Sequence, residues 1–397
     1  MGDNSGASSV IALPKGGGAQ AGLGEKFSPD LHTGTGNFTV PISLPSGRNG
    51  FQPQLNLVYS TGQGNGPCGL GWILNIPGVT RKTSKRIPRY IDNGGDALDL
   101  DTFVLSGAED LVPTTAPSIS NATYRPRTEG LFAHIERRRD AENDLWVVRS
   151  KDGLVSFYGT ENSKGNDPAV IADPSGDAQD KIFAWKVTKT VDPFGNLIRY
   201  EYERDRVLEG ARSWDQIYLR RIQYADYFHD GEQRFLVSVM FEYEERPDPF
   251  SEYRSGFEIR TRKRCRFITI RTHADQERVV RTYELIYLDA RPELVRLVPL
   301  NGMSLLSQVV VKGHDGEHQE AMPPLEFGYS GFDPLVHKTE NIEGASLPST
   351  SLANSNLELV DLFGQGLPDI LEMSPVTIQY WRNLGNGQFG FPRTMST

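Results

Sequence analysis

Four long segments in the second half of the chain restrict its fold more than any other feature of the sequence. Each alternates apolar and polar residues with a period of two, which places successive side chains on opposite faces of a β-strand. The segments are residues 235–246, 256–272, 279–289 and 305–313. Their order along the chain predicts an antiparallel sheet that carries at least one large insertion.

Shorter segments of the same kind occupy the first half, separated by turn sequences such as SGRNG, KDG and DPFGN. They are residues 36–45, 51–60, 131–139, 145–150, 154–159, 181–191 and 197–203. Forty glycines and 25 prolines suit tight turns, and 15 tyrosines and 19 phenylalanines suit half-buried pleated surfaces. We therefore predict an all-β fold with a large curved antiparallel sheet and long surface loops, one of them at 161–179.

Composition divides the chain into a main domain and a small terminal unit. Residues 1–12 are predicted to be a flexible tail and residues 13–340 the β domain. The sequence SLPSTSLAN marks a linker at 341–356. Residues 357–397 then form one unit that resembles a propeller blade, an incomplete propeller because several such repeats are needed to bury their faces. The sequence leaves open whether the natural protein continues past Thr397.

Charge and apolar content exclude two classes of partner. The formal net charge of −9 argues against a general nucleic-acid or anionic-membrane surface. No apolar run approaches the roughly 20 residues needed to cross a bilayer, and the first residues lack the pattern of a secretory signal. We expect no direct membrane insertion, a chain that is cytoplasmic before export, and export by a route without a classical signal peptide.

The stretch GNGPCGLGW, residues 64–72, raises the first question of chemistry. Gly64, Gly66 and Gly69 satisfy the spacing of a phosphate-binding loop, but Pro67 interrupts it and the chain continues as a strand where such a loop needs a helix. Cys68 has no histidine near it in sequence to activate a thiol. The favoured interpretation is a tight bend with Cys68 as a small apolar residue and a core tryptophan beneath it. The second cysteine, Cys265, allows at most one disulfide bridge.

An alternating strip of arginines is the most basic feature of the long segments. On a strand its four guanidinium groups share one face and could bind phosphate or carboxylate. The alternatives are pairing across strands with acidic residues such as Glu242 and Glu244, or the lining of a polar cavity. The strip consists of Arg260, Arg262, Arg264 and Arg266.

Three further patterns are weak candidates for chemistry. Glu201 with Glu203, like Glu242 with Glu244, gives the paired carboxylates of ADP-ribosyltransferases, but no Ser-Thr-Ser strand accompanies them. His314 and His318 lie in a turn-rich segment without a third zinc ligand. The loop from Asp361 to Asp369 has the outline of a calcium site but too few oxygen ligands for tight binding, which favours a loop kept for its turn geometry. We predict no catalytic, cofactor-binding or metal-binding residue.

Several motifs together resemble the amino-terminal domain shared by the virulence protein SpvB and the B components of insecticidal toxin complexes (TcB, TcaC). They run in the same order through residues 13–329 and include ALPKGGG, TGTGNFTVPI, SGRNGFQPQLNLVYSTGQGNGPCGLGW, TRKTSKRIPRY, VLSGAEDLVP and DPFSEYRSGFEIRTRKRCR. Residues 357–390 resemble the FG-GAP or VCBS-type repeat that opens the propeller of toxin-complex B components.

The resemblance implies a structural role. In toxin complexes the B component and an Rhs-type C component build a hollow β shell around a cytotoxic segment, and the B propeller docks on the channel-forming A component. In SpvB the same domain precedes an ADP-ribosyltransferase domain, and we expect none in this chain. We therefore expect a non-enzymatic structural and delivery module of a secreted toxin, without cofactors. The alternatives are an extracellular module that binds a host glycan or protein and, less favoured, a domain linked to an ADP-ribosyltransferase.

Overall fold

The computed structural model describes most of the chain. The described residues are 24–29, 36–92, 100–106, 109–114, 121–128, 132–175, 181–209, 212–316, 318–329 and 340–395. They divide into two compact units, one that holds the described residues up to 329 and one that holds residues 340–395. Each unit is described by itself.

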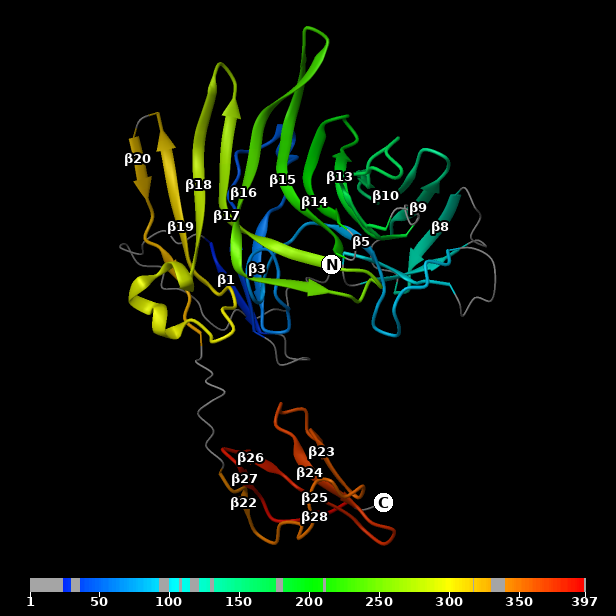
Figure 1. Ribbon diagram of the computed structural model, residues 1–397, viewed down its shortest axis with the longest axis vertical. Coiled ribbons are helices and arrows are strands. Elements are labelled where there is room, and N and C mark those ends of the chain that lie inside the picture. The colour runs from blue at the N-terminus through cyan, green and yellow to red at the C-terminus, as the bar shows by residue number, and fades with distance from the viewer. Residues whose placement is uncertain are drawn as a thin grey trace, which may run out of the picture. The chain divides into compact units, whose positions relative to one another are not determined.

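Long antiparallel strands dominate the first unit, which confirms the predicted all-β fold with a large antiparallel sheet. Neighbouring strands pair in chain order, and both β20 and β21 pair with β19. This long sheet contains β13 (Ile182–Val191), β14 (Leu197–Glu209), β15 (Arg212–His229), β16 (Glu232–Glu252), β17 (Ile259–His273), β18 (Glu277–Tyr287), β19 (Leu306–Asp315), β20 (His318–Ala321) and β21 (Leu325–Glu326) (Figure 1).

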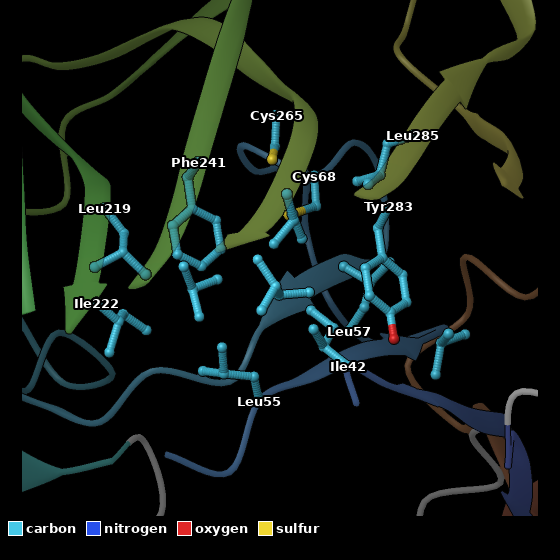
Figure 2. Packing of buried hydrophobic residues seen from close by; sticks show 14 of the residues in the cluster. Ile42, Leu55, Leu57, Cys68, Leu219, Ile222, Phe241, Cys265, Tyr283 and Leu285 are labelled. Atoms are coloured by element: carbon cyan, nitrogen blue, oxygen red, sulfur yellow. The ribbon is translucent and has the colours of Figure 1, made fainter. Parts of the chain in front are cut away.

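One face of the long sheet is apolar and is covered by a small four-stranded sheet. The small sheet has the order β1-β2-β3-β4. Its strands are β1 (Lys26–Pro29), β2 (Gly36–Pro41), β3 (Asn56–Ser60) and β4 (Trp72–Leu74). Figure 2 shows Leu55 and Leu57 of the small-sheet segment packed beneath Phe241, Ile222 and other side chains of the long sheet. The two sheets therefore enclose a common apolar core, and the opposite face of the long sheet is left uncovered by it.

The first part of the chain closes into a barrel, which the sequence analysis did not predict. Pairing runs β5-β6-β7-β8-β9-β10-β11-β13 and returns from β13 to β5. The barrel shares β13 with the long sheet (Figure 1). Its other strands are β5 (Gly78–Arg81), β6 (Phe103–Leu105), β7 (Glu109–Pro113), β8 (Asn121–Pro126), β9 (His134–Arg139), β10 (Asp144–Arg149) and β11 (Val155–Tyr158).

Aromatic residues fill the barrel. Trp146 and Trp185 are fully buried, with ring centroids 6.0 Å apart, and Phe103 lies 4.8 Å from Trp146 and 5.9 Å from Trp185. Such edge-to-face contacts add to the free energy gained by burying the rings. The interior is thus a packed core and leaves no open channel among these side chains.

The predicted surface loop at 161–179 differs from the structure. Residues Val170–Ala172 form strand β12, which pairs with β13, and Val170 and Ala172 belong to the barrel core. The apolar run AVIA, whose last three residues form β12, explains the difference, because burying apolar side chains away from water lowers the free energy. Residues 176–179 lie outside the described residues.

The second unit is a small β structure of its own. A four-stranded antiparallel sheet has the order β23-β24-β25-β28, and a three-stranded sheet has the order β22-β27-β26. Their bounds are β22 (Glu343–Gly344), β23 (Leu357–Val360), β24 (Asp369–Met373), β25 (Ile378–Trp381), β26 (Asn383–Gly385), β27 (Gln388–Phe389) and β28 (Arg393–Thr394). Part of the predicted linker belongs to this unit, since Ser346 accepts a hydrogen bond from the indole of Trp381 at 2.9 Å.

Candidate functional site

The face of the long sheet that the small sheet leaves uncovered carries two rows of side chains, all of them polar except Met240. Residues directly opposite one another in an antiparallel sheet point to the same side. One row is Lys189, Arg199, Gln223, Ser238 and Arg271, and the next is Glu201, Arg221, Met240, Thr269, Thr282 and Lys312. We call these eleven residues the polar face.

Most charges of the polar face are paired within the chain. The Arg221 guanidinium binds both carboxylate oxygens of Glu201 at 2.9 Å, and the Lys312 ammonium lies 3.4 Å from Glu284. The Lys189 ammonium pairs with Glu161 in the loop after β11. Because these pairs are partly exposed, each contributes at most about 1 kcal/mol to stability. The face therefore presents a mixed and largely neutralised charge pattern.

The arginine strip is also neutralised by ion pairs. Arg264 is nearly buried and bonds Glu244 at 2.7 Å and Asp289 at 2.7 Å. The partners of the other three are Glu258 for Arg260, Asp205 for Arg262 and Glu284 for Arg266. Pairing across strands, one of the predicted alternatives, is therefore found for Glu244. Glu242 pairs with none of the four arginines.

The paired carboxylates follow the same pattern. Glu201 binds Arg221, and Glu203 binds Lys263 at 2.7 Å. The tyrosines between the acidic residues point the other way, since Tyr202 donates to the Val187 carbonyl and Tyr243 donates to the Leu219 carbonyl, each at 2.8 Å. Glu201 and Glu203 are therefore held by basic residues, as Glu244 is held by Arg264.

A pocket of about 600 Å³ lies where β14 separates from the barrel. Arg199 donates to Gln233 at 2.8 Å, and Gln233 donates in turn to the buried carboxylate of Asp226 at 3.1 Å. Burial raises the pKa of Tyr200, which keeps its hydroxyl protonated. Lining residues include Glu161, Lys189, Arg199, Tyr200, Glu201 and Gln233. We call this space the junction pocket.

One contact on the polar face has the order of a nucleophile, a base and an acid. The Ser238 hydroxyl lies 2.7 Å from Nε2 of His273, and Nδ1 of His273 lies 3.5 Å from Glu277. Covalent catalysis also needs an accessible nucleophile and donors for the developing oxyanion. Ser238 is only 3 % exposed. A substrate would reach it only if neighbouring side chains moved.

The barrel holds a buried ionic cluster that the sequence analysis missed. Arg137 binds Asp144 through two hydrogen bonds of 2.9 and 3.0 Å and contacts Asp92 at 2.9 Å. Arg81 binds Asp92 and Asp101, each at 2.9 Å. All five side chains are at most 6 % exposed. Arg137 and Arg81 also lie about 5 Å from the Phe103 ring.

Acid is expected to weaken this structure. Burial alone would raise the pKa of Asp92, but Arg137 and Arg81 outweigh it and hold that pKa far below its usual value. Burial opposes the same effect at Asp248, where hydrogen bonds from Arg246 and Ser304 lower the pKa to about 2. A carboxyl whose pKa is lower in the folded state stabilises the fold above its unfolded pKa, near 3.8, and loses this effect as the pH falls. The urea concentration at the midpoint of unfolding should decrease as the pH is lowered from 4 to 2. A midpoint concentration that stays the same over this range would contradict the prediction.

The stretch GNGPCGLGW forms the bend between β3 and β4. Gly69 has a φ of +90°, its neighbour Leu70 donates to the Ser304 carbonyl at 2.9 Å, and the Gly66 carbonyl accepts from Arg246 at 2.9 Å. The bend is followed directly by a strand, without the helix that a phosphate-binding loop requires. It therefore serves to attach the small sheet to the long sheet.

Gly69→Ala should destabilise the first unit by at least about 2 kcal/mol. Its new Cβ would lie 2.8 Å from the Ser304 oxygen and 3.2 Å from the Tyr287 ring, in a backbone conformation that alanine rarely adopts. Gly64→Ala is the matched control, because nothing lies within 4 Å of its Cβ position. Urea unfolding of both variants tests this, and equal losses would show that the bend tolerates the substitution.

The remaining candidates form no assembled site. The carboxylate of Asp361 accepts backbone hydrogen bonds from Gln365 and Gly366 at 3.1 and 2.7 Å, so the loop uses it for its turn. His314 and His318 lie on paired strands, and His314 contacts Thr282 at 3.1 Å. Within the described ranges, no group of three His, Cys, Asp or Glu side chains is placed to hold a metal ion. Nor does any helix in those ranges have the length and apolarity to cross a membrane.

Sequence comparison connects the chain to a family of virulence proteins. The profile of the family described as Salmonella virulence plasmid 65kDa B protein (SpvB) matches residues 30–245 and 225–273. The mono(ADP-ribosyl)transferase SpvB of Salmonella typhimurium strain 14028s is 29 % identical over 323 residues, which cover 67 % of this chain and 51 % of that protein. The Salmonella dublin protein of the same name matches equally. The chain thus spans about half the length of these curated relatives.

Solved structures share the fold. The crystal structure of TcdB2–TccC3 superposes with a TM-score of 0.69 and 26 % identity over 98 % of this chain and 21 % of that one. A pore structure of the Photorhabdus luminescens Tc holotoxin superposes with a TM-score of 0.70 and 25 % identity, over 100 % of this chain and 20 % of that one. The amino-terminal domain of SpvB from Salmonella typhimurium strain LT2 superposes with a TM-score of 0.56 and 24 % identity, over 70 % of this chain and 99 % of that one. Since the family profile covers more than half of its residues, this chain belongs to the SpvB family.

Proposed function

We propose that this chain is a non-enzymatic structural and delivery module of an exported bacterial toxin. In this proposal its long sheet is part of a β wall, and the polar face borders the enclosed cytotoxic segment of a partner. The observation that carries the proposal is the match of 98 % of the chain to one fifth of a TcdB2–TccC3 chain. A chain that corresponds to a portion of a larger assembly is expected to act through contacts with the remainder.

The sheet itself supports a wall. Its apolar face is covered by the small sheet, so within the described part of the chain the polar face is the side left to border another chain. That face combines charges of both signs, most of them paired, and a mixed surface of this kind avoids strong attachment to any one passing segment. The partners we propose are an Rhs-type C component and a channel-forming A component. We further propose that the second unit is the first FG-GAP or VCBS-type repeat of an incomplete propeller.

Three observations support the inference that this chain has no catalytic activity of its own. The relatives named mono(ADP-ribosyl)transferase contain about as much sequence again as the matched part, and we place their activity outside that part. Glu201, a candidate carboxylate that lines the junction pocket, forms an ion pair with Arg221. Ser238 is too deeply buried for an extended substrate. We infer that the chain reaches its target as an exported protein and that catalysis belongs to another domain or partner.

Assembly with a C component tests the proposal. The purified chain and an Rhs-type C component from the same toxin should co-elute in size exclusion, with a mass by light scattering equal to their sum. Albumin, which like this chain carries a net negative charge, replaces the chain in the negative control for non-specific association. Separate elution at micromolar concentrations, with both proteins folded by circular dichroism, would contradict the wall.

Activity assays test the absence of catalysis separately. We expect no NAD cleavage by the chain and no labelling of Ser238 by a fluorophosphonate probe. Cleavage that is lost in Glu201→Gln, or labelling that is lost in Ser238→Ala, would show a reaction centre. Either result would overturn the non-enzymatic proposal whatever the chain assembles with.

A further inference from the structure

The two cysteines of the chain meet although 196 residues separate them in sequence. Cys68 lies in the bend between β3 and β4, and Cys265 lies in β17. The backbone N–H of Cys265 donates to the carbonyl oxygen of Pro67 at 2.7 Å. Because that carbonyl is bonded to the nitrogen of Cys68, standard bond lengths limit the separation of the two cysteine Cα atoms to about 7 Å. Disulfide-linked cysteines usually have Cα atoms about 4.4–6.8 Å apart.

The side chains of the two cysteines also share one environment. Both are buried in the same apolar cluster, with 6 % and 2 % exposure, and both are free thiols in this structure. Figure 2 shows Cys265 above Cys68, with the sulfur of Cys265 turned toward the Cys68 side chain. The bend and β17 therefore place both thiols on the inner side of the contact between the small and long sheets.

We propose that Cys68 and Cys265 form a disulfide bond when the chain folds in an oxidising environment. Each thiol loses its proton to solvent and one S–S bond forms between the two sulfurs. The two electrons pass to a small disulfide such as glutathione disulfide, whose own S–S bond breaks and which takes up two protons from solvent to become two thiols. The bond would fasten the small sheet covalently to the long sheet. Its biological setting rests on the proposed export, whereas its formation is tested without any partner.

The folded, reduced protein is expected to resist oxidation. Burial raises the pKa of Cys68 to about 12 and raises that of Cys265 well above its usual value. The thiolate is the species that attacks a disulfide, so neither sulfur reacts readily once it is enclosed. The bond therefore forms while the chain folds. It then closes a loop of about 200 residues, which limits the unfolded chain and stabilises the folded one.

Expression in two hosts tests the inference. The full chain is produced in a reducing cytoplasm and in a cytoplasm made oxidising with a disulfide isomerase, and each product is alkylated after unfolding. From the oxidising host we expect an intact mass lower by two hydrogens, no alkylation, and a peptide pair joining Cys68 to Cys265. Its melting temperature should exceed that of the reduced protein by at least about 4 °C.

Controls separate bond formation from folding. Cys68→Ser and Cys265→Ser should each leave one alkylatable thiol in both hosts and show no difference in melting temperature between hosts. Circular dichroism confirms that each product is folded. A folded wild-type chain from the oxidising host that still carries two alkylatable thiols would overturn the inference. Failure of the C component to bind would leave it unaffected.

Discussion

Replacing Arg137 by methionine should reduce the free energy of unfolding of the first unit by about 3–5 kcal/mol. Arg137 lies inside the barrel, where it neutralises Asp144 and shares Asp92 with Arg81. Without Arg137 the carboxylates of Asp92, Asp101 and Asp144 remain buried. The guanidinium groups still in contact with them belong to Arg81, which is fully buried, and to the partly exposed Arg139. A buried charge without a partner costs several kcal/mol, and methionine restores only the volume of the aliphatic stem.

Arg138→Met is the matched control, because it changes the next residue of the same strand. Its side chain is 36 % exposed and its guanidinium lies 3.3 Å from Glu136, a partly exposed pair whose loss should cost less than about 1 kcal/mol. Urea unfolding followed by circular dichroism compares the two variants. If Arg137→Met were no more destabilising than Arg138→Met, the ionic cluster would not stabilise the barrel.

Trp72→Ala should destabilise the first unit by about 3–5 kcal/mol. Trp72 is 1 % exposed, its ring centroid lies 4.6 Å from that of Phe327 and 5.2 Å from that of Tyr59, and its indole donates to the Tyr329 hydroxyl at 3.0 Å. Alanine would leave a large cavity under the bend and a hydroxyl without its donor.

Phe194→Ala provides the control for loss of an aromatic ring. Phe194 lies in the turn between β13 and β14 and is 79 % exposed, so its removal should change stability by less than about 0.5 kcal/mol. The same unfolding measurement applies to both variants. A loss below about 1 kcal/mol in Trp72→Ala would mean that the contact between the two sheets does not depend on this residue.

The period of two predicted most long strands because it depends only on neighbouring residues. It failed for β15, where the pairing with β14 skips Arg220 and where Ala225 has a φ of +58°. The β-bulge at Arg220 shifts the alternation by one residue within the strand. A sequence pattern without this shift would have shown β15 as clearly as its neighbours.

The barrel and its ionic cluster could not be predicted for another reason. Closure depends on the pairing of Trp185 with Val79, more than 100 residues away, and nothing local specifies that pairing. The cluster likewise gathers Arg81, Asp92 and Asp144 from separate segments. By contrast, the bend at Gly69 and the buried Trp72 followed from the local turn sequence.

Protection of lysines on the polar face tests the central claim most directly. Lys189 and Lys312 lie on that face and are 32 % and 33 % exposed, whereas Lys151 lies exposed in the turn between β10 and β11. The rate of acetylation of each is measured in the free protein and in the assembly with the C component. We predict a large decrease at Lys189 and Lys312 with little change at Lys151. If each of the three lysines were acetylated at the same rate in the assembly as in the free protein, the proposal that the polar face borders the partner would be contradicted.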